Sequence, residues 1–302
     1  MDFHADLRAL LLAPRGTQAE HVQLLQKRAA KRSHPEEWNT QFGPKSLFQA
    51  WTSSPLMQAL YGKNTAVIRP LLDRTTNWRV VELGGGDGRI WELLRPDDRG
   101  EILLIDPQPE VHAQVASRMP SGVNLQSVVD VAQAQADWGQ ADLVLSSLTL
   151  HHVAGLDAEQ REEMGLRGPG KLEVLRRAKA ALADRQGLLL LNEASVHCEI
   201  DLAPNGPELI DNLIDSYLRR CAKAMLDSIE QEPEHPMSAQ WLSIAHRWCL
   251  DQITVGTLPL AERDVYELDV LRWLDLLPRA GFQVEGHQFS DPYRLFCQYL
   301  CR

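Results

Sequence analysis

The sequence predicts an α/β protein: a mostly parallel β-sheet with helices on both faces, a helical N-terminal extension and a helical insert after the fifth strand. Two observations predict it. From Trp78 onwards, short runs of β-branched and leucine residues alternate with amphipathic stretches, as in strands joined by crossover helices. Directly after the first run, the segment VVELGGGDGRI (80–90) supplies the glycines that a sharp strand-to-helix turn needs.

The alternating pattern predicts seven strands and four connecting helices. The strands are expected at residues 79–83, 102–105, 124–129, 142–146, 188–191, 282–285 and 295–300. The helices are expected at residues 88–94, 111–118, 170–183 and 268–280.

The remaining segments have a helical pattern. Thr17 and Glu20 form a capping box at the start of one helix. Apolar residues between positions 44 and 72 are spaced for one or two amphipathic helices. We therefore divide the chain into an N-terminal helical extension (1–77), a core (78–193 and 264–302) and a helical insert (194–263).

Composition limits the classes of partner. The chain has 302 residues, 44% of them hydrophobic, and a formal net charge of -10. Residues 1–79 carry 11 Lys and Arg against 6 Asp and Glu, and the remainder carries 20 against 35. An acidic body disfavours nucleic acid as a partner. The five cysteines are scattered, and no signal peptide or membrane-spanning run is evident, so we expect a reduced, cytoplasmic protein without a metal site.

The glycine-rich turn does not fit two common nucleotide motifs. The dinucleotide fingerprint G-x-G-x-x-G can start at any of the glycines 84–86, but a required glycine is then replaced by Arg89, Asp87 or Trp91 respectively. A Walker loop needs Gly-Lys-Ser/Thr, which does not follow. From this segment alone, a glycine-rich turn that binds no ligand remains an alternative.

The spacing E-x-G-x-G-x-G, from Glu82 to Gly88, resembles the first motif of class I S-adenosylmethionine-dependent methyltransferases. The closing order of helix, strand and antiparallel strand is also similar to that family. The resemblance implies a seven-stranded sheet with an antiparallel last strand, and S-adenosyl-L-methionine as cofactor with S-adenosyl-L-homocysteine as product. It places the methionine part of the cofactor beside Glu82, Gly84, Gly85 and Gly86.

Two acids close the next two strands. Asp106 ends the run EILLID, where a carboxylate can accept hydrogen bonds from both ribose hydroxyls; the alternative is a capping residue before Pro107. Asp130 follows the third strand, and the resemblance implies that it binds the adenine amino group while the amide of Val131 meets a ring nitrogen. Asp130 is equally suited to cap the following helix, and the two roles are compatible.

The segment ADLVLSSLTLHHV (141–153) resembles the family's motif around the fourth strand. The strand end projects Ser147 toward the cofactor, and His151 and His152 follow in the loop. A neutral histidine can take a proton from the methyl acceptor, and the alternative is that one ring only packs or hydrogen-bonds. Glu193, just past the fifth strand, is placed to touch the substrate. We expect these three to be the catalytic residues.

The resemblance implies methyl transfer, but it covers the core only. We expect a small-molecule acceptor, methylated on oxygen, nitrogen or carbon, in a pocket covered by the extension and the insert. Both segments are rich in aromatic residues, which alternatively form core: Trp38, Phe42, Trp51, Tyr61, Tyr217, Trp241 and Trp248. Segment 146–150 lacks the N/D-P-P-Y/F tetrapeptide of N6-adenine and glutamine methyltransferases. A protein or RNA methyltransferase and a non-catalytic cofactor-binding regulator remain alternatives, and the sequence leaves monomer or homodimer open.

Overall fold

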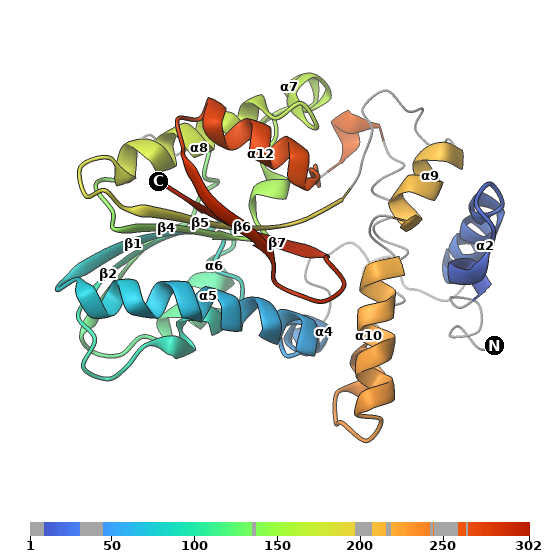
Figure 1. The fold of residues 1–302 in the computed structure, drawn as a ribbon, viewed down its shortest axis with the longest axis horizontal. Helices are drawn as coiled ribbons and strands as arrows, with labels where there is room; N and C mark the ends of the chain where they lie inside the picture. The colour runs from blue at the N-terminus through green and yellow to red at the C-terminus, as the bar shows by residue number, and fades with distance from the viewer. Residues whose placement is uncertain are drawn as a thin grey trace.

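A seven-stranded β-sheet forms the centre of the protein in a computed structural model (Figure 1). The structure describes residues 9–30, 45–134, 137–196, 207–215, 219–241, 244, 259–263 and 265–302. The strands are β1 (Trp78–Leu83), β2 (Gly100–Ile105), β3 (Val123–Val128), β4 (Leu143–Ser147), β5 (Leu188–Ala194), β6 (Val284–Phe289) and β7 (Phe296–Cys301). Their order is β3-β2-β1-β4-β5-β7-β6.

The sheet is parallel except at one edge. Strands β1 to β5 pair in parallel, whereas β7 runs antiparallel to both β5 and β6. The central strands are apolar on both faces, as in β5 (LLLLNEA), in which every residue is buried. Such runs suit a sheet covered by helices on both sides. The seven-stranded sheet with its antiparallel last strand is thus confirmed.

Two helical layers cover the sheet. The long helix α5 (Pro55–Arg74) lies on one face, and α8 (Pro169–Leu182) and α12 (Val270–Arg279) lie on the other (Figure 1). The core on the α5 side includes α6 (Pro109–Ala116) and Trp91, and the core on the α8 side includes Trp273 and Tyr299. The chain therefore buries two separate apolar layers, one on each face.

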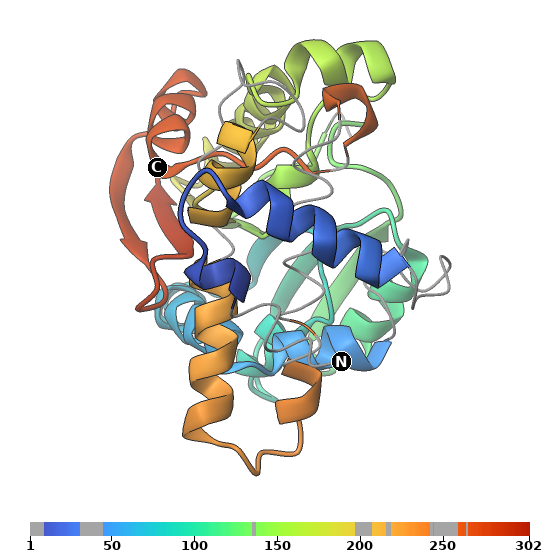
Figure 2. The ribbon, with the colours of Figure 1, turned by 90° about the vertical axis from the view of Figure 1, so that its right-hand side faces the viewer.

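Helices from the N-terminal extension and from the insert gather beyond the carboxyl ends of the parallel strands. They are α2 (Gln18–Ala30), α4 (Lys45–Thr52), α9 (Pro207–Leu213) and α10 (Arg219–Gln231) (Figure 1). In Figure 2, which looks onto this end, α2 crosses in front of the sheet. Trp51 and Trp241 are buried in the apolar cluster that joins these helices, and the Trp241 indole donates to the carbonyl of Ala50 at 3.2 Å. These two aromatic residues therefore form core.

Polar contacts connect the extension to the insert. The amide of Gly16 donates to Asp211 at 2.9 Å, and Arg15 donates to Asn212 at 2.6 Å. Asp211 is buried, whereas Arg219 and Asp215 form an i,i+4 ion pair at 2.9 Å. Segments almost 200 residues apart are thereby held together beside the sheet.

Two local expectations are corrected, and one helix is added. The helix expected at 88–94 is a short 3₁₀ helix, η1 (Arg89–Leu93), and the left-handed Gly88 and the extended Leu94 limit its length. A helix that the sequence analysis missed, α7 (Ala158–Met164), precedes α8. Strand β5 extends to Ala194, because antiparallel pairing with β7 lengthens it, so Glu193 lies inside this strand and not beyond it.

The other predicted helices of the core and of the extension agree in outline with the described residues. The segment 44–72 forms the two helices α4 and α5. Helix α2 begins directly after Thr17, whose hydroxyl donates to the carbonyl of Pro14 at 2.7 Å, and the capping box with Glu20 stays a prediction. The aromatic residues Trp38, Phe42, Tyr217 and Trp248 lie outside the described residues.

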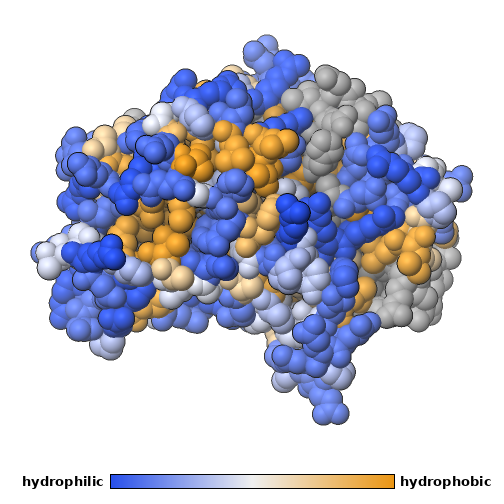
Figure 3. Space-filling model, in the orientation of Figure 1, coloured by the Kyte–Doolittle hydropathy of each residue, from blue (hydrophilic) through white to orange (hydrophobic). Residues whose placement is uncertain are grey.

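The surface in Figure 3 is mostly hydrophilic, with separate apolar patches. Among the helices that the structure describes, none combines the length and the hydropathy that a bilayer crossing requires.

Gly84→Ala should destabilise the fold. Gly84 has φ +75, and a Cβ atom there would overlap the hydroxyl oxygen of Thr149, which lies in the loop after β4. Backbone strain and steric overlap together are expected to cost about 1–3 kcal/mol of unfolding free energy, measured by urea denaturation. Gly286→Ala is the control, because nothing lies within 4 Å of a Cβ at that position. Equal stability of the two variants would contradict this account of the turn.

Candidate active site

The glycine turn follows β1 at the carboxyl edge of the sheet. Gly84, Gly86 and Gly88 all have positive φ, which favours residues without a side chain. The amide of Gly84 donates to the carbonyl of Ile105 at 3.0 Å, so the turn stays attached to the end of β2. A methyl group on Gly86 would meet only the ring of Phe48, at 3.7 Å. The backbone of the turn is therefore approachable at Gly86.

Asp106 lies against this turn. One carboxylate oxygen accepts from the amide of Gly85 at 3.0 Å and the other from the amide of Gln108 at 2.8 Å. A carboxylate offers about four lone-pair directions, so acceptor capacity is left on both oxygens. Burial raises the pKa of Asp106, and the two amide hydrogen bonds and His112 oppose this rise.

Asp130 lies next to Asp106 at the end of β3. The amides of Asp106 and Asp130 both donate to the carbonyl of Val128, at 3.2 and 3.1 Å. The carboxylate of Asp130 accepts from the amide of Val131 at 2.8 Å. The amide that was expected to meet the adenine ring thus has an internal partner, so the expected adenine contact requires this carboxylate to turn.

Glu82 is held inside the protein beneath the turn. It is 2% exposed, and one carboxyl oxygen accepts from the Trp91 indole at 2.7 Å. Burial raises the pKa of Glu82 to about 8. The hydrogen bond from Trp91 lowers this pKa, and the nearby charge of Asp106 raises it further. In this position Glu82 links β1 to η1.

Helix α4 contacts the turn through residues that the sequence analysis missed. Asp87, between two of the glycines, accepts from the hydroxyl of Thr52 at 2.8 Å and from the amide of Arg89 at 3.0 Å. Phe48 of the same helix lies over Gly86. Only the identity of residue 87, an acid inside a glycine motif, offered a signal, and nothing local pointed to Thr52.

The loop after β4 closes the other side of the site. Leu148 has φ +54, a rare conformation for a non-glycine residue, and its amide donates to the carbonyl of Asn192 at 2.9 Å. The carbonyl of Ser147 accepts from the Thr149 hydroxyl at 3.2 Å. Because Thr149 also packs against Gly84, the loop and the glycine turn are in direct contact.

Glu193 organises this loop from β5. One of its oxygens accepts from the amides of Thr149 and Leu150, at 3.1 and 2.6 Å, and the other contacts Nδ1 of His151 at 2.9 Å. Its side chain is 1% exposed. The structure thus brings together two of the predicted catalytic residues, and gives Glu193 three contacts within the protein.

The two histidines lie side by side. Burial lowers the proton affinity of His151, but the charge and hydrogen bond of Glu193 outweigh burial, and the pKa of the ring is raised above its ordinary value. The ring of His152 lies 4.1 Å from that of His151, centroid to centroid, at an interplanar angle of 54°. The contact between Nδ1 and the Glu193 carboxylate fixes the orientation of the His151 ring.

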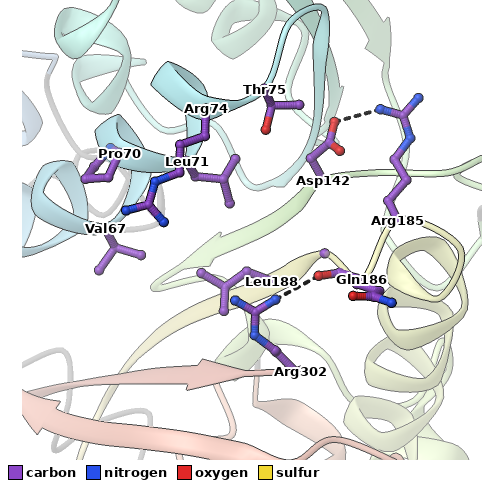
Figure 4. Close-up of a pocket in the computed structure, with 11 residues that line it drawn as sticks. Val67, Pro70, Leu71, Arg74, Thr75, Asp142, Arg185, Gln186, Leu188 and Arg302 are labelled. Carbon is purple, nitrogen blue, oxygen red and sulfur yellow. Dashed lines mark hydrogen bonds and ion pairs between the residues drawn. The ribbon is translucent and has the colours of Figure 1, made fainter.

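A separate cavity of about 300 Å³ lies at the opposite edge of the sheet (Figure 4). It is lined by Asp142, before β4, and Leu188, at the start of β5, so it opens at the amino ends of the strands. Two of its arginines are already engaged, Arg185 with Asp142 at 2.7 Å and Arg302 with the carbonyl of Gln186 at 2.8 Å. Ligands of parallel sheets bind at the carboxyl ends, which separates this cavity from the site.

In the described part of the chain, no group of three or more His, Cys, Asp or Glu is arranged to hold a metal ion.

Glu82→Gln should flatten the dependence of stability on pH. The folded protein keeps a proton on Glu82 up to about pH 8, whereas the unfolded chain releases it at about pH 4.3. Between these values the folded state binds the extra proton, so unfolding free energy falls as pH rises, by about 1.4 kcal/mol per unit.

Glutamine still accepts from Trp91 but cannot ionise. Urea denaturation at several pH values from about 5 to 8 should therefore show a shallower decline for Glu82→Gln than for the parent. Glu110→Gln, at an exposed residue of α6, is the control. An unchanged slope in Glu82→Gln would show that this group does not carry the pH dependence.

Solved structures show the same fold. The citrinin polyketide synthase CMeT domain matches with a TM-score of 0.54 at 14% identity, over 98% of this chain and 67% of that one. The CurJ carbon methyltransferase matches with a TM-score of 0.50 at 14% identity, over 99% and 66%. A possible exported protein from Bordetella parapertussis gives 0.50 at 15% identity, over 100% and 97%. The chain spans about two thirds of the length of the first two.

At the level of sequence, no curated protein matches the chain significantly. The profile of a family described as a methyltransferase domain matches residues 17–250, well over half of the chain. This match agrees with the sheet order and with the glycine turn at the end of β1. The chain therefore belongs to the methyltransferase domain family and is a class I S-adenosylmethionine-dependent methyltransferase.

Proposed function

We propose that the protein methylates a small-molecule acceptor that gives up a proton to His151 during the transfer. The observation that carries the proposal is the contact between Nδ1 of His151 and the buried carboxylate of Glu193, at 2.9 Å. An ionised carboxylate can only accept hydrogen bonds, so this contact favours the tautomer with its proton on Nδ1. The lone pair is then on Nε2, which makes that nitrogen the proton acceptor.

In this proposal Glu193 is a positioning residue, not a substrate contact. Its oxygens hold the amides of Thr149 and Leu150 as well as the ring of His151. A base held by a second group in this way is a recurrent arrangement in catalytic sites, because it fixes both the tautomer and the direction of the ring. The ring of His152 packs at a tilt against that of His151, and we assign it a packing role.

The residues at the carboxyl edge fit the cofactor. The backbone of Gly84, Gly85 and Gly86 would flank its methionine part, and the free acceptor capacity of Asp106 would bind the ribose hydroxyls. Asp130 and Val131 would bind the adenine, and Ser147 would face the cofactor from the end of β4. When bound, S-adenosylmethionine supplies an electrophilic methyl group on a sulfonium. The protein's own work is then to align the acceptor, exclude water and take up a proton.

The acceptor is proposed to bind beneath the helices of the extension and the insert. These helices lie beyond the carboxyl ends of the strands, on the side of the glycine turn (Figures 1 and 2). A covered site suits a small molecule better than a large one. One of the structurally similar proteins is a carbon methyltransferase by name, and a carbon acceptor needs a base to remove its proton. A cytoplasmic location stays a prediction.

Asp106→Ala should abolish cofactor binding while leaving the protein folded. S-adenosylhomocysteine raises the melting temperature of a protein that binds it, in proportion to the logarithm of its concentration over Kd. We expect this increase in the parent and no increase in Asp106→Ala. Asp275→Ala, at an exposed residue of α12, is the control and should behave like the parent. A full shift in Asp106→Ala would contradict the ribose assignment.

His151→Ala and Glu193→Gln should both lower methyl transfer by about 10²-fold or more, because general-base catalysis contributes factors of this size. The assay follows labelled methyl from S-adenosylmethionine into three acceptor probes, namely a phenol, an amine and a β-ketothioester, with a protein extract and total RNA as further arms. His152→Ala is the matched comparison and should retain more activity than His151→Ala.

Full activity of His151→Ala on every methylated probe would contradict the role of His151 as proton acceptor. Transfer to the protein or RNA arm alone would contradict the small-molecule assignment. The S-adenosylhomocysteine melting shift of each variant separates lost chemistry from lost cofactor binding.

A further inference from the structure

Two buried ionisable side chains beside the histidine loop have no part in the function described so far. Lys171 of α8 is 0% exposed, and Glu267, in the segment before α12, is 9% exposed. Together with His151 and Glu193 they form a cluster drawn from four separate segments. Lysine and glutamate are almost never buried to this extent unless a specific arrangement stabilises them.

The histidine loop is in contact with the side chain of Lys171 and with the backbone next to Glu267. The Lys171 ammonium donates to the carbonyl of Val153 at 2.7 Å, directly after the histidine pair. The amide of Tyr266 donates to the carbonyl of His151 at 2.7 Å, which places Glu267 beside the same loop. The ammonium also lies 5.7 Å from the centre of the Tyr266 ring. The four groups therefore share one small buried volume.

The charges in this volume act on each other. Burial lowers the pKa of Lys171 to about 7, although Glu193 and Glu267 attract its positive charge. Burial raises the pKa of Glu267 to about 7; His151 lowers it, Glu193 raises it and Lys171 lowers it. His151 in turn interacts with all three. A proton added at one member therefore changes the proton affinity of the others.

Given the role proposed above for His151 as proton acceptor, we propose that Lys171 and Glu267 are positioning residues that hold the histidine loop and set the pH range in which His151 is a free base. The positive charge of Lys171 disfavours protonation of the His151 ring, and the negative charge of Glu267 favours it. The charge of Lys171 limits the rise in the pKa of His151 that the two carboxylates cause, while the carboxylates stabilise the imidazolium once it forms.

The charge balance supports this assignment. The charged and titratable groups facing His151 are Glu193 from β5, Glu267 from the segment before α12, Lys171 from α8 and His152 from its own loop. With both acids ionised and Lys171 protonated, a neutral His151 leaves the cluster with one excess negative charge. When Nε2 takes a proton from the acceptor, the electron pair of the broken bond stays on the acceptor. The cluster of side chains then becomes neutral.

The proposal is tested by titrating His151 directly. The probe is the ring nitrogens of ¹⁵N-histidine-labelled full-length protein, followed by NMR against pH, and His151→Gln identifies the signal by its loss. Lys171→Met removes the opposing positive charge and should raise the pKa of His151 by about one unit. Glu267→Gln removes the supporting negative charge and should lower it by a similar amount.

Two controls change the same charges elsewhere. Lys179→Met alters a lysine of α8 that lies over Phe282, and Glu173→Gln alters a glutamate of α8 that pairs with Arg177. Neither should move the His151 titration. Circular dichroism checks the fold of each variant, and if Lys171→Met unfolds, Glu267→Gln decides the question alone.

Shifts of opposite sign in the two variants would support the proposal. A His151 titration that stays unchanged in both, or that moves in the same direction in both, would overturn it. The titration needs no methyl acceptor, so its failure is distinguishable from failure of the methyl-transfer assay, which tests the proposed function itself.

Discussion

The hydrogen bonds to the Glu193 carboxylate hold the active-site region together. One side chain from β5 takes two backbone amides and one histidine ring from the loop after β4. This loop contains Leu148 in a left-handed conformation, which costs free energy and persists only where the surroundings stabilise it. The hydrogen bonds that Glu193 accepts from two amides offset that cost, because buried amides without a partner would destabilise the fold further. A charged side chain buried inside a strand is thus explained by the loop that it holds.

The same loop fixes the glycine turn. Thr149, held by Glu193, packs where a side chain on Gly84 would lie, so glycine is required at that position for two reasons, its φ and its neighbour. The turn is also fixed by Asp106 through the amide of Gly85. Three strand ends, those of β1, β2 and β4, are therefore joined through two carboxylates. The cofactor residues and the proposed base are held by the same set of contacts. A change in the carboxylate of Asp106 or of Glu193 therefore affects both parts of the site.

Much of the fold follows from local patterns in the sequence. The apolar runs, the glycine spacing and the acid at position 106 are each recognisable within a few residues. All seven strands and the turn were therefore predictable. The exact end of β5 was not, because it depends on pairing with β7 about 100 residues later. For the same reason Glu193 was expected beyond the strand. The contacts of Thr52 with Asp87, and of Lys171 with Val153, join distant segments and leave no local pattern.

In the proposed function, Glu193 fixes His151 so that Nε2 faces the methyl group of the cofactor. A crystal structure with S-adenosylhomocysteine bound tests this most directly, since the sulfur marks where the methyl is attached. The account predicts the ribose on Asp106, the homocysteine part along Gly84–Gly86, and Nδ1 of His151 still on Glu193 with Nε2 directed at the space in front of the sulfur. A His151 ring that points away from this space, with the cofactor bound in the glycine turn, would contradict it.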